Sequence, residues 1–269
     1  MKFKLGIIAG GGNLPSSIAD AYKINGGECF IAGLKGYAEP KLFDKFSYKS
    51  FKIGNVGAIL EFFKNNNVTK IAFAGRVNRP NLSNIQADFM GCILLARILK
   101  AKILGDDSLL QIITNFVEEK GYEVISASDL LAQNAILAIK SNNQLAEQDL
   151  IDIDLGVKVT RALGNLDIGQ AVIVQNGYVV GIEAAEGTDN LIKRCSELRV
   201  TNKGGVLIKM MKSFQDRRLD IPTIGPQTIE LLALYNYSGI AIEKNKVIVV
   251  EAQKTIDLAD QHKIFITEI

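Results

Sequence analysis

Charged side chains of both signs crowd into one short stretch of the chain, QDRRLDIPTIGP at residues 215–226. Asp216 and Asp220 enclose two adjacent arginines, Arg217 and Arg218. Carboxylates can hold Mg²⁺ or activate water, and guanidinium groups bind phosphate oxygens. The stretch is therefore a candidate site for phosphate-ester or phosphoanhydride chemistry. An Asp–Arg ion-pair cluster that pins a turn is the alternative interpretation, and composition alone supports both.

A second acidic group lies earlier in the chain, where Glu183, Glu186 and Asp189 fall close together. Oxygen ligands at this spacing can converge on Mg²⁺, which keeps several of its waters. The same acids can equally mark the start of a helix, where the helix dipole favours negative charge. Together with Asp216 and Asp220 they predict an acidic site beside basic residues.

A glycine triplet, Gly10, Gly11 and Gly12, follows an apolar run and precedes a helical pattern. In that context backbone N–H groups can approach an anion, which favours phosphate contact over a plain tight turn. The spacing is neither GxGxxG nor a P-loop. Arg76 and Arg79 follow another strand pattern, where they can bind phosphate or simply stand in a solvated loop.

The composition excludes several kinds of chemistry. The 31 Lys and Arg nearly balance the 29 Asp and Glu, so no nucleic-acid-binding surface is indicated. A single histidine, His262, excludes a multi-histidine zinc site. Three cysteines without CxxC spacing favour a reducing, cytoplasmic setting. The apolar run at residues 5–9 is too short for a signal peptide, and no stretch reaches the ~20 apolar residues of a membrane span, so a soluble protein is expected.

Two α/β domains joined by a linker are expected to position these residues. In the first half, strand patterns at residues 3–9, 29–32, 46–53, 70–74 and 124–126 alternate with helical ones, which predicts βαβ units and a largely parallel sheet. The apolar pattern at residues 92–104 favours a core helix, with a dimer contact or a surface for acyl chains as the alternative. We predict an N-terminal domain at 1–130, a linker at 131–145 and a C-terminal catalytic domain at 146–269.

The second half contains the strongest turn signal in the chain. Strand patterns at 171–175 and 178–182 flank Asn176-Gly177, a pair that suits a type I′ hairpin. A helix at 188–198 is expected to be capped by Thr188 or Asp189. Further strands at 206–209, 239–242, 247–250 and 264–267, with helices at 148–163 and 255–261, predict a mixed sheet.

Six motifs in order along the chain resemble one family. They are GIIAGGGNLP (6–15), AGRVNRP (74–80), GDDSLL (105–110), LGNLDIGQAVIVQNG (163–177), IEAAEGTDNLI (182–192) and QDRRLDIPTIGP (215–226). On these motifs the chain resembles the LpxI-type UDP-2,3-diacylglucosamine pyrophosphatases of lipid A biosynthesis, nearly end to end.

The resemblance implies a reaction and a set of site residues. The family hydrolyses UDP-2,3-diacylglucosamine to UMP and 2,3-diacylglucosamine 1-phosphate (lipid X), with water attacking the β-phosphorus and a divalent cation, Mg²⁺ or Mn²⁺, required. Members dimerise, and the lipid product lies between their two α/β domains. The essential aspartate maps to Asp216 or Asp220, and Asp216 is preferred. From the residues themselves we predict Asp216, Glu183 and Glu186 as ligands of the metal. We also predict a set of substrate contacts, which are Gly10, Gly11, Gly12, Arg76, Arg79, Gly187, Thr188, Asp189, Lys209, Arg217, Arg218 and Thr223.

The implied substrate is a lipid, and no membrane span is expected in this chain. A cytoplasmic protein of this kind is expected to contact the inner leaflet of the membrane transiently. Two other functions stay open on the sequence: a non-catalytic UDP-sugar-binding regulator that uses the glycine triplet, and a sugar-nucleotide transferase.

Overall fold

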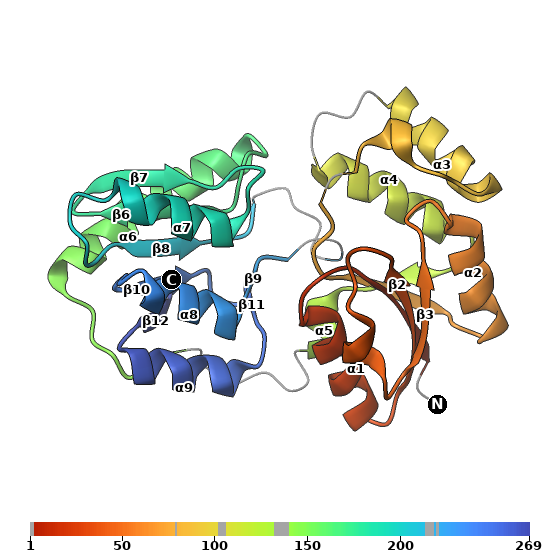
Figure 1. Ribbon diagram of the computed structural model, residues 1–269, viewed down its shortest axis with the longest axis horizontal. Coiled ribbons are helices and arrows are strands. Elements are labelled where there is room, and N and C mark those ends of the chain that lie inside the picture. The colour runs from red at the N-terminus through yellow and green to blue at the C-terminus, as the bar shows by residue number, and fades with distance from the viewer. Residues whose placement is uncertain (1–2, 79, 102–105, 132–139, 213–217, 219–220) are drawn as a thin grey trace. The chain divides into compact units, whose positions relative to one another are not determined.

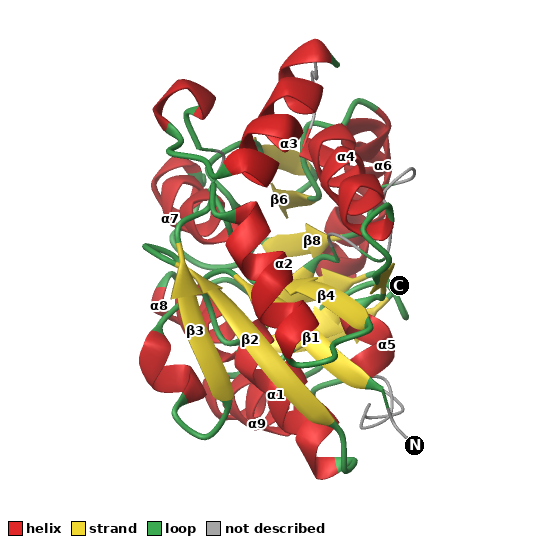
Figure 2. Ribbon diagram, turned by 90° about the vertical axis from the view of Figure 1, so that its right-hand side faces the viewer, coloured by secondary structure: helices red, strands yellow, loops and turns green. Residues whose placement is uncertain are grey.

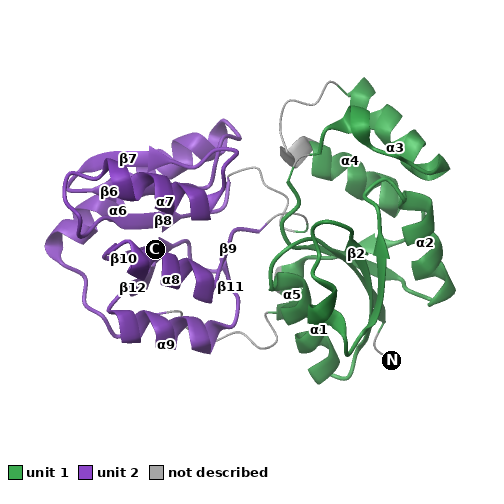
Figure 3. Ribbon diagram, in the orientation of Figure 1, with its two compact units in different colours: residues 1–134, 216–220 green, residues 135–215, 221–269 purple. Residues whose placement is uncertain are grey.

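The computed structural model describes residues 3–78, 80–101, 106–131, 140–212, 218 and 221–269. The chain divides into two compact units, which Figure 3 colours separately. Unit 1 comprises residues 1–134 and 216–220, and unit 2 comprises residues 135–215 and 221–269. Within the described ranges, no helix is both long and apolar enough to cross a bilayer.

Unit 1 is built on a five-stranded sheet in the order β3-β2-β1-β4-β5. Its strands are β1 (Lys4–Ala9), β2 (Glu28–Leu34), β3 (Ser47–Phe51), β4 (Lys70–Ala74) and β5 (Glu123–Val124). All neighbouring strands pair in parallel, which confirms the predicted parallel sheet. β1 and β2 are almost wholly buried, as expected for strands that are covered on both faces. Figure 2 shows β3, β2 and β1 side by side with α2 lying across them.

The helices of unit 1 surround this sheet. They are α1 (Leu14–Ile24), α2 (Val56–Asn65), α3 (Phe89–Lys100), α4 (Asp106–Glu118) and α5 (Ala127–Leu131), with short 3₁₀ turns at Pro40–Phe43 and Leu82–Asn84. α3 packs on α2 and α4 instead of on the strands. α2 and α4 share a core with alternate β2 residues, in which Phe63 of α2 and Val117 of α4 lie with Phe30 of β2. α1 packs against α5, and the Cys29 thiol of β2 lies against the Ala19 carbonyl of α1.

Unit 2 contains a mixed sheet in the order β12-β10-β8-β6-β7. Its strands are β6 (Ala171–Gln175), β7 (Tyr178–Ile182), β8 (Val206–Lys209), β10 (Gly239–Ile242) and β12 (Phe265–Glu268). β8, β10 and β12 are parallel, while β6 is antiparallel to both β7 and β8, which confirms the predicted mixed sheet. The turn between β6 and β7 has positive φ at Asn176 (54°) and Gly177 (74°), as a type I′ hairpin requires.

The helices of unit 2 cover both faces of the mixed sheet (Figure 1). α6 (Glu147–Asn165) packs on one face, against buried residues of β6, β8, β10 and β12. α7 (Thr188–Leu198), α8 (Pro226–Leu234) and α9 (Ala252–His262) share the core of the other face. The strand expected at 247–250 forms as β11 (Ile248–Val249), but it pairs with β9 (Thr223–Ile224) in a separate two-stranded ladder.

Candidate active site

Ionisable residues stand at one edge of the unit 2 sheet. β7, β8 and β10 all run in the same direction, because β6 is antiparallel to β7 and β8 and β10 is parallel to β8. The chain leaves β7 at Glu183, ends β8 with Lys209 and leaves β10 at Glu243. Ligands of open α/β sheets bind beyond the carboxyl ends of the strands, so this edge is the first place to look for a site.

Three of these polar residues form a buried cluster, Glu183–Thr188–Lys209, whose members are 5%, 4% and 5% exposed. The Thr188 hydroxyl donates to Glu183 Oε1 at 2.6 Å. The Lys209 ammonium donates to Thr188 Oγ1 at 2.9 Å and to the carbonyl oxygen of Thr223 at 2.9 Å. Because an unpaired charge is costly to bury, these hydrogen bonds are what allow a carboxylate and an ammonium to lie inside the protein.

The direction of the hydrogen bonds gives each member of the cluster a role. A hydroxyl has one proton to give, and Thr188 gives it to Glu183, so its lone pairs are left to accept from Lys209. The second Glu183 oxygen accepts from the backbone N–H of Gln170 at 3.2 Å. Glu183 therefore orients the Thr188 hydroxyl, and that hydroxyl holds the Lys209 ammonium in place.

The local sequence explains why Thr188 is free to do this. α7 begins after Gly187, which is the N-cap with φ of 78° and makes no side-chain cap hydrogen bond. The expectation that Thr188 or Asp189 caps the helix is therefore wrong. A positive φ is easily adopted by glycine, so Gly187 turns the chain and leaves the Thr188 hydroxyl for Glu183. Gly169 is also required, since a Cβ there would collide with the Glu183 carbonyl.

Glu186 and Asp189 lie outside the buried cluster. Glu186 Oε1 accepts from Arg194 Nη2 at 2.7 Å, and Glu186 Oε2 accepts from the N–H of Ala184 at 3.2 Å. Partial burial opposes ionisation of Glu186, but the hydrogen bonds from Arg194 and the backbone outweigh it and lower the pKa of this carboxyl. Asp189 is half-buried and makes a long contact of 3.4 Å with Gln227 Nε2.

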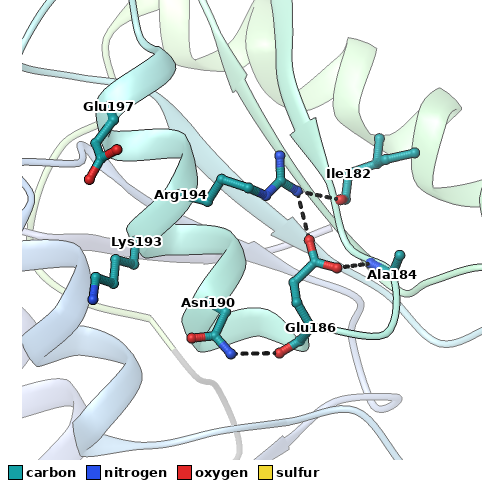
Figure 4. Close-up of a pocket in the computed structure, with 7 residues that line it drawn as sticks. All are labelled: Ile182, Ala184, Glu186, Asn190, Lys193, Arg194 and Glu197. Atoms are coloured by element: carbon teal, nitrogen blue, oxygen red, sulfur yellow. Dashed lines mark hydrogen bonds and ion pairs between the residues drawn. The ribbon is translucent and has the colours of Figure 1, made fainter.

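The Glu186–Arg194 ion pair lines a shallow groove beside α7 (Figure 4). Its other lining residues are Ile182, Ala184, Asn190, Lys193 and Glu197. The groove shares the loop after β7 with the buried cluster, but none of the cluster's three residues lines it. We therefore place the candidate chemistry at the cluster and not in this groove.

The described acids do not fit a preformed metal site. In the part of the chain that the structure describes, no group of three or more Asp, Glu, His or Cys side chains is placed to hold an ion. Both oxygens of Glu183 and both oxygens of Glu186 accept hydrogen bonds from protein donors. Asp216, the third expected ligand, lies outside the described residues.

The charged stretch that opened the sequence analysis is described only in part. Asp216, Arg217 and Asp220 lie outside the described residues, as does Arg79 of the other basic loop. Arg218 is described, and its Nη1 lies 2.8 Å from Glu118 Oε1 at the end of α4. Glu118 was not expected from the sequence, because the two partners are a hundred positions apart and no local pattern links them.

The chain on either side of this stretch is fixed to unit 2. Before it, Lys212 Nζ pairs with Asp167 Oδ1 at 2.6 Å, and the Lys212 side chain is only 11% exposed. The N–H of Met211 also donates to Glu243 Oε2 at 3.1 Å. After it, the Pro222 carbonyl accepts from the N–H of Ile248 at 2.8 Å where β9 and β11 pair. The segment from 213 to 220 is thus joined to fixed points at both ends.

The glycine triplet lies at the carboxyl edge of the unit 1 sheet, between β1 and β4, where the strand order reverses. The N–H of Gly10 donates to Ala74 O at 2.8 Å, and the N–H of Gly11 donates to Arg76 O at 2.9 Å. Those two donors are therefore used by the end of β4 and by the loop that follows it. Gly12 has φ of 83° and open space where a side chain would lie, so it and the start of α1 are the open part of the turn. The structure thus brings Arg76 beside the triplet.

The two carboxyl edges define an α/β protein of the class that binds ligands beyond its parallel strands. Comparison with known proteins gives the family: the chain belongs to the LpxI family. The model of the LpxI N-terminal domain matches residues 4–134, and the model of the LpxI C-terminal domain matches residues 138–267. The resemblance drawn from the six motifs is confirmed.

One curated relative and one solved structure illustrate the range of similarity. The chain is 33% identical over 270 residues to the UDP-2,3-diacylglucosamine pyrophosphatase LpxI of Caulobacter vibrioides. The alignment covers 98% of this chain and 96% of that protein. An N5-carboxyaminoimidazole synthase from Aspergillus clavatus, solved with ADP and a ribonucleotide, matches 74% of this chain and 44% of that one. Its identity of 10% and TM-score of 0.24 carry no argument.

Proposed function

We propose that this protein hydrolyses the pyrophosphate bond of UDP-2,3-diacylglucosamine to give UMP and 2,3-diacylglucosamine 1-phosphate. The observation that carries the proposal is the full-length match to a relative bearing that activity in its name, across both domains. The buried cluster agrees with it, because Glu183 and Thr188 lie in one of the shared motifs and place a cation at the carboxyl edge of unit 2.

Lys209 is proposed as a ligand of the pyrophosphate. The substrate carries two negative charges there, and fixed cations stabilise the charge of a phosphoryl group during transfer. Glu183 and Thr188 act as positioning residues, since they hold the Lys209 ammonium through the hydrogen bonds described above. Thr223 contributes through its carbonyl oxygen, which accepts from the same ammonium.

Asp216 is proposed as the carboxylate that orients or deprotonates the attacking water, with Asp220 as its support. A carboxylate within hydrogen-bond reach of a water can accept its proton as the oxygen attacks phosphorus. Attack at the β-phosphorus breaks the bond to the bridging oxygen, so UMP leaves with that oxygen and the water oxygen stays on the sugar phosphate. Arg217 and Arg218 are proposed phosphate ligands, with Arg218 shared between substrate and Glu118.

In unit 1, the proposed phosphate contacts come from Gly12, the start of α1 and Arg76, with Arg79 nearby in sequence. Backbone N–H groups at a helix N-terminus suit an anion. The N–H groups of Gly10 and Gly11 donate to Ala74 at the end of β4 and to Arg76, so their proposed role is to hold the turn in shape.

A product assay tests the function directly. Purified protein with Mg²⁺ and UDP-2,3-diacylglucosamine is expected to release UMP without any acceptor. In ¹⁸O-labelled water the label is expected in the sugar phosphate. Label in UMP would refute attack at the β-phosphorus. Tight binding without turnover would favour a UDP-sugar-binding regulator, and turnover only with an added acceptor would favour a transferase.

Removal of divalent cations is expected to abolish the release of UMP. The described glutamates do not fit a metal cage, so we propose that Mg²⁺ or Mn²⁺ accompanies the pyrophosphate and neutralises part of its charge. Rates should be measured after treatment with EDTA and again after Mg²⁺ is added back, with Ca²⁺ as a comparison. Full activity in excess EDTA would contradict the requirement for a cation.

A further inference from the structure

Helix α3 is apolar on two sides. Its buried side presents Gly91, Leu94 and Ile98 to the core of unit 1, where Leu60 and Phe116 also lie. This side alone packs against the core of unit 1. The opposite side of the helix therefore needs a separate explanation.

The other side of α3 is an exposed apolar stripe, which we call the α3 face: Phe89, Cys92, Ala96 and Leu99. Successive members are three or four residues apart, so they lie on one side of the helix. Phe89 is 77% exposed and Leu99 is 65% exposed. The stripe extends for about 15 Å, because Phe89 and Leu99 are ten residue steps apart at a rise of about 1.5 Å each. Single exposed apolar residues are ordinary, but a continuous stripe of this length marks an interaction surface.

The charges around the α3 face are mixed, with an excess of cations near its C-terminal end. α3 itself contains no acidic residue and carries Arg97 and Lys100 in its last turn. Lys120 belongs to the same region, because Arg97 and Lys120 both lie over the Phe116 ring at 5.2 Å from its centroid. Two acids partly offset them: Glu119 pairs with Arg97 at 2.8 Å, and Asp88 caps the N-terminus of α3 beside Phe89. An apolar stripe bordered by lysines suits an anionic lipid surface, whose headgroups attract cations and whose acyl region accepts apolar side chains.

We propose that the α3 face docks this protein on an anionic membrane surface. The inference rests on the proposed function in one respect: a diacylated substrate resides in a bilayer, and a protein that acts on it gains from being held there. The occupant to which we commit is the lipid surface. A second copy of the chain is the competing occupant, and the experiment below separates them.

Co-sedimentation with lipid vesicles tests the proposal. The full chain is expected to bind vesicles of phosphatidylethanolamine with phosphatidylglycerol, and to bind neutral phosphatidylcholine vesicles several-fold less. Adding salt should weaken the binding, because lysine–headgroup attraction is screened. The double variant Phe89→Ser/Leu99→Ser is expected to lose at least about tenfold in partitioning, since two large apolar side chains no longer enter the acyl region.

A matched control removes equally exposed apolar side chains from unit 2. Val200 is 85% exposed and Leu234 is 68% exposed, so Val200→Ser/Leu234→Ser makes the same chemical change elsewhere. This variant should bind vesicles as the natural chain does. Both variants alter solvent-exposed positions, and circular dichroism should show both folded. Turnover of detergent-dispersed substrate should be unchanged in the α3-face variant.

Several results would overturn the proposal. They are no binding of the natural chain to anionic vesicles, equal binding by the α3-face variant, or equal loss in the control variant. If sedimentation shows a dimer that the α3-face substitutions convert to monomer, the face joins two copies instead. Vesicle binding requires no catalysis, so a protein that binds through α3 yet releases no UMP would refute the proposed function and leave this inference intact.

Discussion

Replacing Lys209 with methionine is expected to lower kcat/KM for UMP release by about 10²–10³-fold, the usual loss when one fixed group that stabilises transition-state charge is removed. The loss should fall mainly on kcat, because the ammonium acts on charge that develops during phosphoryl transfer. The substitution also removes the donor to Thr188 Oγ1 and to the Thr223 carbonyl inside the protein, which costs about 1–3 kcal/mol of stability. Thermal unfolding must therefore be measured alongside the kinetics.

Two substitutions of Thr188 distinguish whether the cluster positions Lys209 for the reaction or only stabilises the fold. Thr188→Ser keeps the hydroxyl between Glu183 and Lys209 and should retain most of the activity. Thr188→Val has nearly the same shape but removes the hydroxyl, so it should lower kcat about tenfold or more while the protein stays folded. If Lys209→Met and Thr188→Val lose stability but keep kcat, the cluster is structural only.

The aspartates of the charged stretch carry the second large effect. Asp216→Ala is expected to reduce UMP release by about 10³-fold or more, as the loss of a general base or of a water-orienting carboxylate does. Asp220→Ala should have a smaller effect, and Asp216→Asn should rescue little, because an amide cannot accept the proton. Steady-state kinetics with UMP detection gives these values.

Asp154 provides the control for this series. It is an exposed aspartate on α6 whose partner is Lys158, four residues along the same helix, at 2.6 Å. Surface pairs of this kind contribute little, so Asp154→Ala should leave both kcat and KM unchanged. A more severe defect in Asp220→Ala than in Asp216→Ala would mean that Asp220 acts on the water and Asp216 supports it. Normal activity in both variants would show that neither aspartate takes part in the reaction.

The strands were predictable because the burial of a strand is reflected in the types and spacing of its own residues. The buried run before Gly10 gave β1, and the Asn176-Gly177 pair gave the β6–β7 hairpin with the φ values that such a turn requires. Helix ends were harder. Thr188 has a side chain that commonly caps helices, but the N-cap of α7 is Gly187. The Thr188 hydroxyl instead donates to the buried Glu183 carboxylate.

The contacts that join distant segments were not predictable. Lys209 meets Thr223 and Thr188 only because β8, β9 and α7 are brought together at one edge of the fold. The sequence predicted that the N–H groups of Gly10 and Gly11 approach an anion, but they donate to Ala74 at the end of β4 and to Arg76 just after it. Side-chain and loop pairing of this kind depends on which strands become neighbours, and a single sequence carries no signal for that.

The contacts that fix the chain on either side of the stretch containing Asp216 have an entropic consequence. Lys212, through Asp167, and Pro222, through β11, fix the two ends of a short closed loop. The conformational entropy lost in closing such a loop grows only with the logarithm of its length. Folding of the chain that carries these two anchors therefore meets part of that cost before any substrate arrives. For the roles proposed for Asp216 and Asp220, the two anchors mean that less binding energy is needed to bring this stretch to the reacting phosphorus.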